Sequence, residues 1–179
     1  MILFSLCIKT INQGIIIQRH VKGYGSNFAK YWNDYKVGFG SPDGNYYWIG
    51  LDRMHELTSS GDYYLEIKLK KGGQTKTVKW TTFSVDSESN KYRLTVGGFD
   101  QGTSGLSDWL SYHTGNYFST PDRDNDPSFV HGSVTNGYSG WWFKGCCRSN
   151  LNWGDSLGPY YKLPYGARYD ESTMTLKRK

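Results

Sequence analysis

The chain has 179 residues, which suits one domain with a buried core, and its formal net charge is only +5 at pH 7. Glycine (22 residues), tyrosine (15) and tryptophan (7) are abundant and only 21% of residues are charged, a composition that favours strands, turns and loops over long amphipathic helices. No apolar run approaches the roughly 20 residues of a membrane helix. No basic stripe interleaved with base-stacking aromatics indicates a nucleic-acid partner either.

The first residues differ from the rest of the chain. Met1–Ile8 is apolar but short, and it lacks the basic n-region and the small-residue cleavage site of a signal peptide. A degraded signal peptide, a strand or an irregular start of the sequence would each explain it. We therefore treat residues 1–14 as an atypical or truncated N-terminal segment and residues 15–179 as a single domain.

The first half of the domain alternates short strands and short helices. The apolar run Ile15–Ile17 predicts a strand buried on both faces. Apolar residues at helical spacing predict short helices over 28–36 and 51–58. Between them lie a turn cluster at 38–44 and a segment, 46–49, that is either a strand or the entry to the second helix.

The middle of the sequence predicts an antiparallel sheet. Residues 62–70 alternate apolar and charged side chains, as a half-buried strand does, and Lys71-Gly72-Gly73 turns this strand into a second one over 75–83. Residues 83–85 and 92–96 extend the meander. The predicted class is α+β, with a twisted, mostly antiparallel sheet that includes the Ile15 region and packs short helices.

From Gly97 onward, turn-forming residues dominate, so the C-terminal half should be loop-rich and should carry the binding residues. The basic end Lys177–Lys179 reads as a frayed terminus.

An acidic stretch in this half offers hard oxygen ligands. Asp122, Asp124 and Asp126 alternate in the sequence, as the carboxylates of a Ca²⁺ loop can. An EF-hand does not fit, because its sixth position would be Pro127 rather than Gly and its twelfth Ser133 rather than Glu. A long irregular loop that combines carboxylates with main-chain carbonyls is the better hypothesis.

Several motifs in order carry a resemblance that covers nearly the whole sequence. They are Ile17-Gln18-Arg19, Tyr47-Trp48-Ile49-Gly50-Leu51-Asp52, Asp108-Trp109-Leu110-Ser111-Tyr112-His113, Phe118–Asp126 and Gly140-Trp141-Trp142-Phe143. Together they resemble the C-terminal domain of fibrinogen and the fibrinogen-related domains of ficolins, tachylectin-like lectins, angiopoietins and tenascins. The resemblance implies a fibrinogen C-terminal-like fold with a calcium-binding C-terminal half, in a secreted, extracellular recognition module.

The resemblance also implies a ligand set for the calcium ion. Asp124 and Asp126 would supply carboxylates, main-chain carbonyls near Ser128 and Val130 would complete the shell with water, and Asp122 would lie outside it. This loop has one residue more than in most relatives, so the carbonyl positions are the less fixed part of the set.

Cysteine usage departs from the family pattern. The sequence has only Cys7, Cys146 and Cys147, and the family's usual partner for Cys146 falls at Ser133. Three hypotheses stay open: a vicinal Cys146–Cys147 disulfide, a bond from either to Cys7, or three free thiols. An odd count leaves at least one thiol unpaired within a monomer.

A ligand pocket beside the calcium loop is the second implied site. Its residues here would be Gly145, Cys146 and Cys147, with Cys147 at the position of a family histidine, and an aromatic wall from Trp153, Tyr160 and Tyr161. A thiol is a weak hydrogen-bond partner for an acetyl or hydroxyl group. The aromatic residues are equally well explained as core.

The function predicted from these features is calcium-dependent binding of glycans or acetylated ligands, as in a ficolin-like lectin of innate recognition. The alternative is a protein-interaction module, like the ends of angiopoietins and tenascins, that binds a cell-surface or matrix protein without a glycan. Self-association into a homo-oligomer stays open. No nucleophile elbow, Walker loop or His-Glu-x-x-His motif is present, and His55 and His113 read as structural hydrogen-bonders, so the protein is not predicted to be an enzyme.

Overall fold

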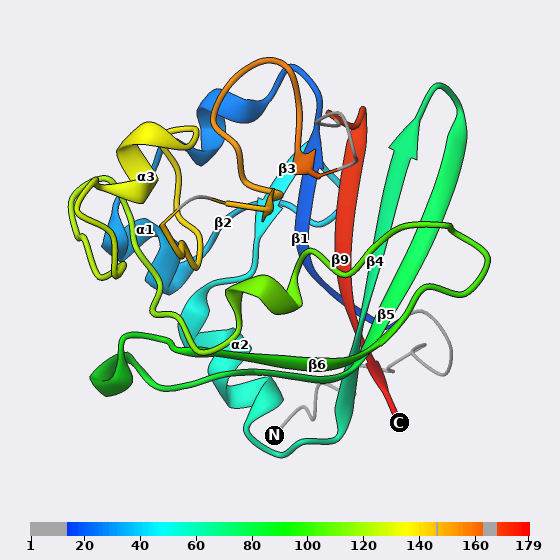
Figure 1. The fold of residues 1–179 in the computed structure, drawn as a ribbon, viewed down its shortest axis with the longest axis horizontal. Helices are drawn as coiled ribbons and strands as arrows, with labels where there is room; N and C mark the ends of the chain where they lie inside the picture. Colours follow the sequence, from blue (N-terminus) through cyan, green and yellow to red (C-terminus); the bar gives the residue numbers. More distant parts are fainter. Residues whose placement is uncertain (1–13, 146, 163–167) are drawn as a thin grey trace, which may run out of the picture.

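A computed structural model describes residues 14–145, 147–162 and 168–179. Seven strands form one sheet in the order β2-β3-β1-β9-β4-β5-β6, and every neighbouring pair is antiparallel. The strands are β1 (Ile15–Val21), β2 (Phe39–Gly40), β3 (Tyr46–Trp48), β4 (Tyr63–Lys71), β5 (Gln74–Val85), β6 (Leu94–Asp100) and β9 (Glu171–Arg178). Figure 1 shows this sheet twisted, with the loop-rich C-terminal half beside it. The α+β class and the antiparallel sheet are confirmed.

The helices are short. They are α1 (Trp32–Val37), α2 (Leu51–Thr58) and α3 (Gly132–Thr135), with 3₁₀ turns η1 (Gly25–Phe28), η2 (Glu88–Asn90) and η3 (Ser111–His113). The second helix has the predicted bounds. The first is shorter than the predicted 28–36, because Phe28 ends a separate 3₁₀ turn and the helix starts only at Trp32.

The C-terminal strand β9 corrects the prediction of a frayed basic end. Lys177 and Arg178 belong to β9, which lies between β1 and β4 in the middle of the sheet (Figure 1). Met174 and Leu176 point into the core while Lys177 lies against Glu66, with 3.1 Å between Nζ and Oε1. The basic sequence did not predict a central strand, because only one face of β9 is apolar.

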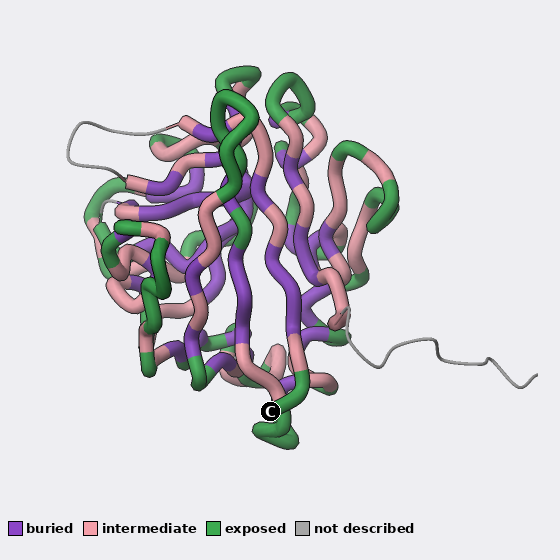
Figure 2. Tube along the Cα trace, turned by 90° about the vertical axis from the view of Figure 1, so that its right-hand side faces the viewer, coloured by how far each residue is buried: buried purple, intermediate pink, exposed green. Residues whose placement is uncertain are grey.

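The first strand is also less buried than its sequence predicts. Ile17 is fully buried, but Ile15 and Ile16 are half-buried, so the strand is not covered on both faces. The ladder between β1 and β9 shifts register between Ile16 and Gln18, which alters the alternation of side chains. Figure 2 shows burial along the strands and exposure at the turns that join them.

Aromatic side chains join the sheet to the loop-rich half. Trp142 is fully buried, its Nε1–H donates to the carbonyl oxygen of Tyr92 at 2.7 Å, and its ring lies 6.1 Å from that of Trp48. The rings of Phe118 and Trp142 meet edge to face at 5.0 Å. These contacts fix the loops on the sheet, because buried aromatic pairs add specific geometry to a large apolar area.

Two short strands, β7 (Ser149–Asn150) and β8 (Tyr160–Tyr161), form a separate antiparallel pair in the C-terminal half. Within the described residues, no helix is long and apolar enough to span a membrane.

Candidate calcium loop and ligand pocket

The acidic loop holds Asp126 by both of its carboxylate oxygens. Oδ1 accepts the backbone N–H of Ser128 at 2.9 Å, and Oδ2 accepts that of Gly132, the first residue of α3, at 2.8 Å. The Asp124 carboxylate accepts the N–H of Asp126 at 3.2 Å. Burial, and then the neighbouring Asp124 carboxylate, raise the pKa of Asp126 against the lowering effect of the two backbone bonds. Two carboxylates therefore lie close together, and neither forms an ion pair with a basic side chain of the described residues.

Asp122 has different hydrogen-bond partners from Asp124 and Asp126. Its Oδ1 accepts the backbone N–H of Trp32, the first residue of α1, at 3.0 Å and the hydroxyl of Thr120 at 2.7 Å. The next residue, Arg123, places its guanidinium 4.2 Å from the centre of the Trp32 ring. These contacts tie the loop to α1, whereas the contacts of Asp124 and Asp126 lie within the loop and at the start of α3.

The rest of the expected ligand set is backbone. The carbonyl oxygens of Ser128 and Val130 accept no hydrogen bond from the described residues, although the Ser128 hydroxyl accepts the Val130 N–H at 3.2 Å. Among the same residues, no group of three or more acidic, histidine or cysteine side chains gathers that could hold a metal. Two carboxylates supplemented by carbonyls and water suit Ca²⁺, which accepts such mixed oxygen shells, so the residues fit the ion.

A buried hydrogen bond occupies the position where the resemblance places a missing disulfide. The Ser133 hydroxyl donates to the carbonyl oxygen of Ser139 at 2.7 Å, and both residues are fully buried. Asn150 of β7 donates to the hydroxyl of Ser139 at 3.0 Å. Polar contacts thus fasten α3 to the following loop. Cys7 and Cys146 lie outside the described residues, so the disulfide hypotheses stay open.

The structure divides the predicted pocket residues between surface and core. Gly145 is exposed with a φ of 70°, a conformation that favours glycine, and Cys147 is nearly buried. Tyr161 is fully buried, and its hydroxyl donates to the carbonyl oxygen of Ser107 at 2.8 Å. A fully buried ring has no face that a ligand could contact, so Tyr161 is a core residue rather than part of a pocket wall.

Trp153 and Tyr160 do form a half-buried aromatic pair, with ring centres 5.3 Å apart. Arg168 lies over both rings, at 4.2 Å from Trp153 and 5.4 Å from Tyr160, and pairs with Asp155 at 3.0 Å. Sequence reasoning missed Arg168, because no local pattern shows which ring a distant cation will cover.

The two histidines of the family motifs are structural, as predicted. His113 is fully buried, its Nδ1–H donates to the Trp142 carbonyl oxygen at 2.6 Å, and its Nε2 accepts the Ser149 N–H at 3.2 Å. Burial lowers the pKa of His113 to about 4, so the ring is neutral at physiological pH. His55 donates from Nδ1 to the Val85 carbonyl oxygen at 2.9 Å.

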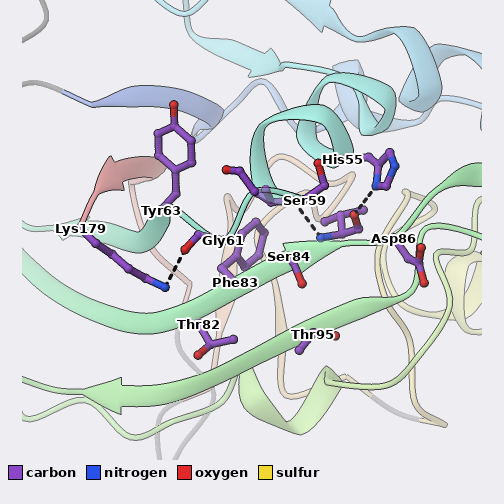
Figure 3. A pocket seen from close by; sticks show the side chains of 13 residues that line it. His55, Ser59, Gly61, Tyr63, Thr82, Phe83, Ser84, Asp86, Thr95 and Lys179 are labelled. Carbon is purple, nitrogen blue, oxygen red and sulfur yellow. Dashed lines mark hydrogen bonds between the residues drawn. The ribbon is translucent and has the colours of Figure 1, made fainter.

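His55 also lines a shallow hollow of about 330 Å³ between α2 and β5, shown in Figure 3. Its charged groups are already engaged: the Lys179 ammonium donates to the Gly61 carbonyl oxygen at 2.8 Å, and Asp86 accepts the Ser87 N–H at 2.7 Å. The remaining lining is mostly hydroxyl, aromatic and backbone, so this hollow shows no convergent set of catalytic groups.

The sequence profile of the C-terminal globular domain of the fibrinogen beta and gamma chains matches residues 5–171, so this protein belongs to that family. Domains of this kind are recognition or interaction modules rather than enzymes. The family predicted from the motifs is confirmed.

Similar proteins include human tenascin-R, 41% identical over 149 residues, which cover 82% of this chain and 10% of tenascin-R. Mouse angiopoietin-related protein 6 is 40% identical over 84% of this chain and 32% of its own length, and ryncolin-4 from Cerberus rynchops is 40% identical over 83% and 40%. The chain thus spans between a tenth and two fifths of these relatives.

Solved structures agree with the fold. The fibrinogen-like globe domain of human ANGPTL6 has a TM-score of 0.79 at 33% identity, covering 92% of this chain and 77% of that domain. Lamprey fibrin D-dimer, complexed with the peptide Gly-His-Arg-Pro-amide, has a TM-score of 0.73 at 25% identity, covering 90% of this chain and 60% of its own.

Proposed function

We propose that this protein is an extracellular recognition domain that binds a cell-surface or matrix protein through a loop ordered by Ca²⁺. Asp124 and Asp126 would hold the ion, together with the carbonyl oxygens of Ser128 and Val130. The ion would neutralise the two neighbouring carboxylates, and it would fix the backbone on both sides of Phe129.

The observation that carries the proposal is the exposure of Phe129. Its side chain is fully exposed, and its neighbour Val130 is 56% exposed. Val134 and Tyr138, which follow on α3 and the next loop, are also exposed. Exposed apolar side chains gathered on one segment are typical of protein-binding surfaces, where a few large side chains supply most of the binding energy.

The relatives support a protein partner. Tenascin-R and angiopoietin-related protein 6 suggest interaction with matrix or cell-surface proteins. The lamprey fibrin structure holds a peptide. An extracellular location for this domain is proposed on the same similarity.

Glycan or acetyl-group recognition is the second candidate, and the half-buried pair of Trp153 and Tyr160 favours it. Aromatic rings beside a charged group can line a small-molecule pocket. This candidate is weaker because Tyr161 is buried, Arg168 already covers both rings, and the resemblance places Cys147 at the position of a family histidine.

Binding of the labelled domain to cultured cells, measured by flow cytometry in Ca²⁺ and in EDTA, tests the proposal. We expect signal only in Ca²⁺, loss after trypsin treatment of the cells, and at least a fivefold loss in Phe129→Ala but not in Val37→Ala. Val37 is 72% exposed at the C-terminal end of α1, the end opposite the contact between Trp32 and Asp122, so it is the apolar control.

Other outcomes separate the two candidates. Loss of binding after periodate oxidation of the cells, with no effect of trypsin, would establish the glycan candidate instead. Binding that ignores both EDTA and Phe129→Ala would refute the calcium-ordered loop as the recognition surface.

A further inference from the structure

Three cations gather over two aromatic rings on the loop-rich half of the domain. Arg148 places its guanidinium 5.0 Å from the centre of the Trp109 ring and 4.8 Å from that of Tyr112. Lys162 lies 5.4 Å from Trp109, and Lys144 lies 5.3 Å from Tyr112. We call these five residues the basic–aromatic cluster.

Firm backbone contacts hold the cluster in place. The N–H of Lys162 donates to the carbonyl oxygen of Arg148 at 2.9 Å, one step beyond the ladder of β7 and β8. The N–H of Trp109 donates to the hydroxyl of the buried Tyr161 at 3.2 Å, and the hydroxyl of Tyr112 donates to the Lys144 carbonyl oxygen at 3.0 Å. The rings and the cations are therefore positioned before any ligand arrives.

The cluster has positive charge without a counter-ion. Like charges placed opposite each other across a ladder destabilise the strand pair, and Arg148 and Lys162 are such neighbours. Among the described residues, none of the three cations forms an ion pair. The nearby Asp108 carboxylate is occupied by the Trp80 indole N–H and the Ser111 N–H, each at 3.0 Å. An anionic ligand would supply the missing charge.

The side chains of the cluster limit the class of ligand that can bind there. Each ring already lies against two cations, so no ring is left as a platform on which nucleic-acid bases could stack. None of the strongly exposed large apolar side chains in the described part of the protein belongs to the cluster, so it offers no apolar anchor for a protein partner. A guanidinium held against aromatic rings suits two-point binding of a sulfate or carboxylate.

We propose that the basic–aromatic cluster is a binding site for an anionic polysaccharide, separate from the calcium loop. Lys144, Arg148 and Lys162 bind sulfate or carboxylate groups spaced along the polysaccharide. The proposal does not rest on the proposed function, because it needs neither Ca²⁺ nor Phe129.

Calorimetric titration of the domain in EDTA at low salt tests the proposal with four probes. They are heparin, hyaluronan, neutral dextran and a poly-glutamate peptide. Heparin carries sulfate and carboxylate, hyaluronan carries carboxylate alone, and dextran carries no charge. We expect heparin to bind, more weakly as salt rises, and dextran not to bind. Hyaluronan reports whether carboxylates suffice: binding like that of heparin assigns the site to carboxylated polysaccharides as well, and weaker binding assigns it to sulfated ones.

Variants locate the site. The double change Lys144→Ala and Lys162→Ala should weaken heparin binding about tenfold, since two cations in one small site are lost. The control, Lys22→Ala with Lys70→Ala, removes two exposed lysines that form no ion pair elsewhere in the described structure, and should change affinity less than twofold. Arg148→Lys keeps the charge but loses the planar fork, so it should weaken binding severalfold and leave the salt dependence unchanged.

Three results would overturn the proposal: no heparin binding at low salt, equal losses in the cluster and control variants, or poly-glutamate binding as tightly as heparin. The last result would assign the cluster to an acidic protein. Near-ultraviolet circular dichroism of each variant separates loss of the site from loss of the fold, and the two lysine changes keep the test valid if Arg148→Lys does not fold.

Discussion

The change Asp124→Asn tests two properties of the acidic loop separately. They are the repulsion between its carboxylates when no ion is bound and its proposed binding of Ca²⁺. The Oδ1 of Asp124 accepts the Asp126 N–H at 3.2 Å, and an asparagine carbonyl can accept the same bond. The substitution therefore removes a charge and keeps the acceptor. Because Asp124 helps to raise the pKa of Asp126, the two carboxylates repel each other when no ion is bound.

The expected magnitudes follow from Coulomb's law and mass action. Two unit charges about 4 Å apart in water repel by about 1 kcal/mol, and screening by dissolved salt reduces this to about 0.5 kcal/mol. In EDTA, Asp124→Asn should raise the melting temperature by about 1–2 °C. With Ca²⁺ at about 100 times its dissociation constant, the unmutated domain should gain about 2.7 kcal/mol, or about 5–10 °C, and the variant almost nothing.

Differential scanning calorimetry in EDTA and in Ca²⁺, with titration calorimetry for the binding heat, measures both effects. Asp43→Asn removes one exposed acid from a turn elsewhere and is the control for net charge. If Asp124→Asn melts lower in EDTA, the two carboxylates do not repel as argued. If it keeps the full Ca²⁺ shift, Asp124 is not a ligand.

Three further predictions test other parts of the structure. Asp122→Ala should cost about 1–2 kcal/mol in urea unfolding, because the Trp32 N–H loses its acceptor, yet should leave the Ca²⁺ binding heat unchanged; lost binding heat would place Asp122 among the ligands. The pKa of His113 is about 4 when folded and about 6.5 when unfolded, so the unfolded state binds protons first and stability falls as the pH drops through this range. His113 should contribute about 2.5 kcal/mol of the loss by about pH 4.5, and His113→Gln should make the slope shallower without abolishing it, because burial also lowers the pKa of His20 to about 4; an unchanged slope would contradict the assignment. Gly140→Ala should cost about 2–3 kcal/mol of unfolding free energy, because its Cβ would meet the buried rings of Phe118 and Tyr35 at 2.7 Å; a melting temperature equal to that of the unmutated domain would show that the rings move aside.

The sequence by itself determined the family, the α+β class and the elements whose pattern is local. The period of two along residues 62–70 predicted β4, the Gly72-Gly73 turn predicted its hairpin, and helical spacing predicted α2 at its observed bounds. The order of the motifs placed the acids on one loop. These features depend on neighbours within a few residues, which a single sequence shows directly.

Only the tertiary structure decided which partners those elements meet. A basic C-terminal segment became the central strand β9 because β1 and β4, which lie far earlier in the sequence, supply both of its ladders. Asp122 and Asp124 are identical in type and two residues apart. The first accepts the N–H of Trp32 in α1, whereas the second accepts an N–H within the acidic loop. Tyr160 and Tyr161 point to opposite sides of one strand, one half-exposed and one buried. Each outcome depends on contacts between distant segments, which the local pattern of apolar and polar residues does not show.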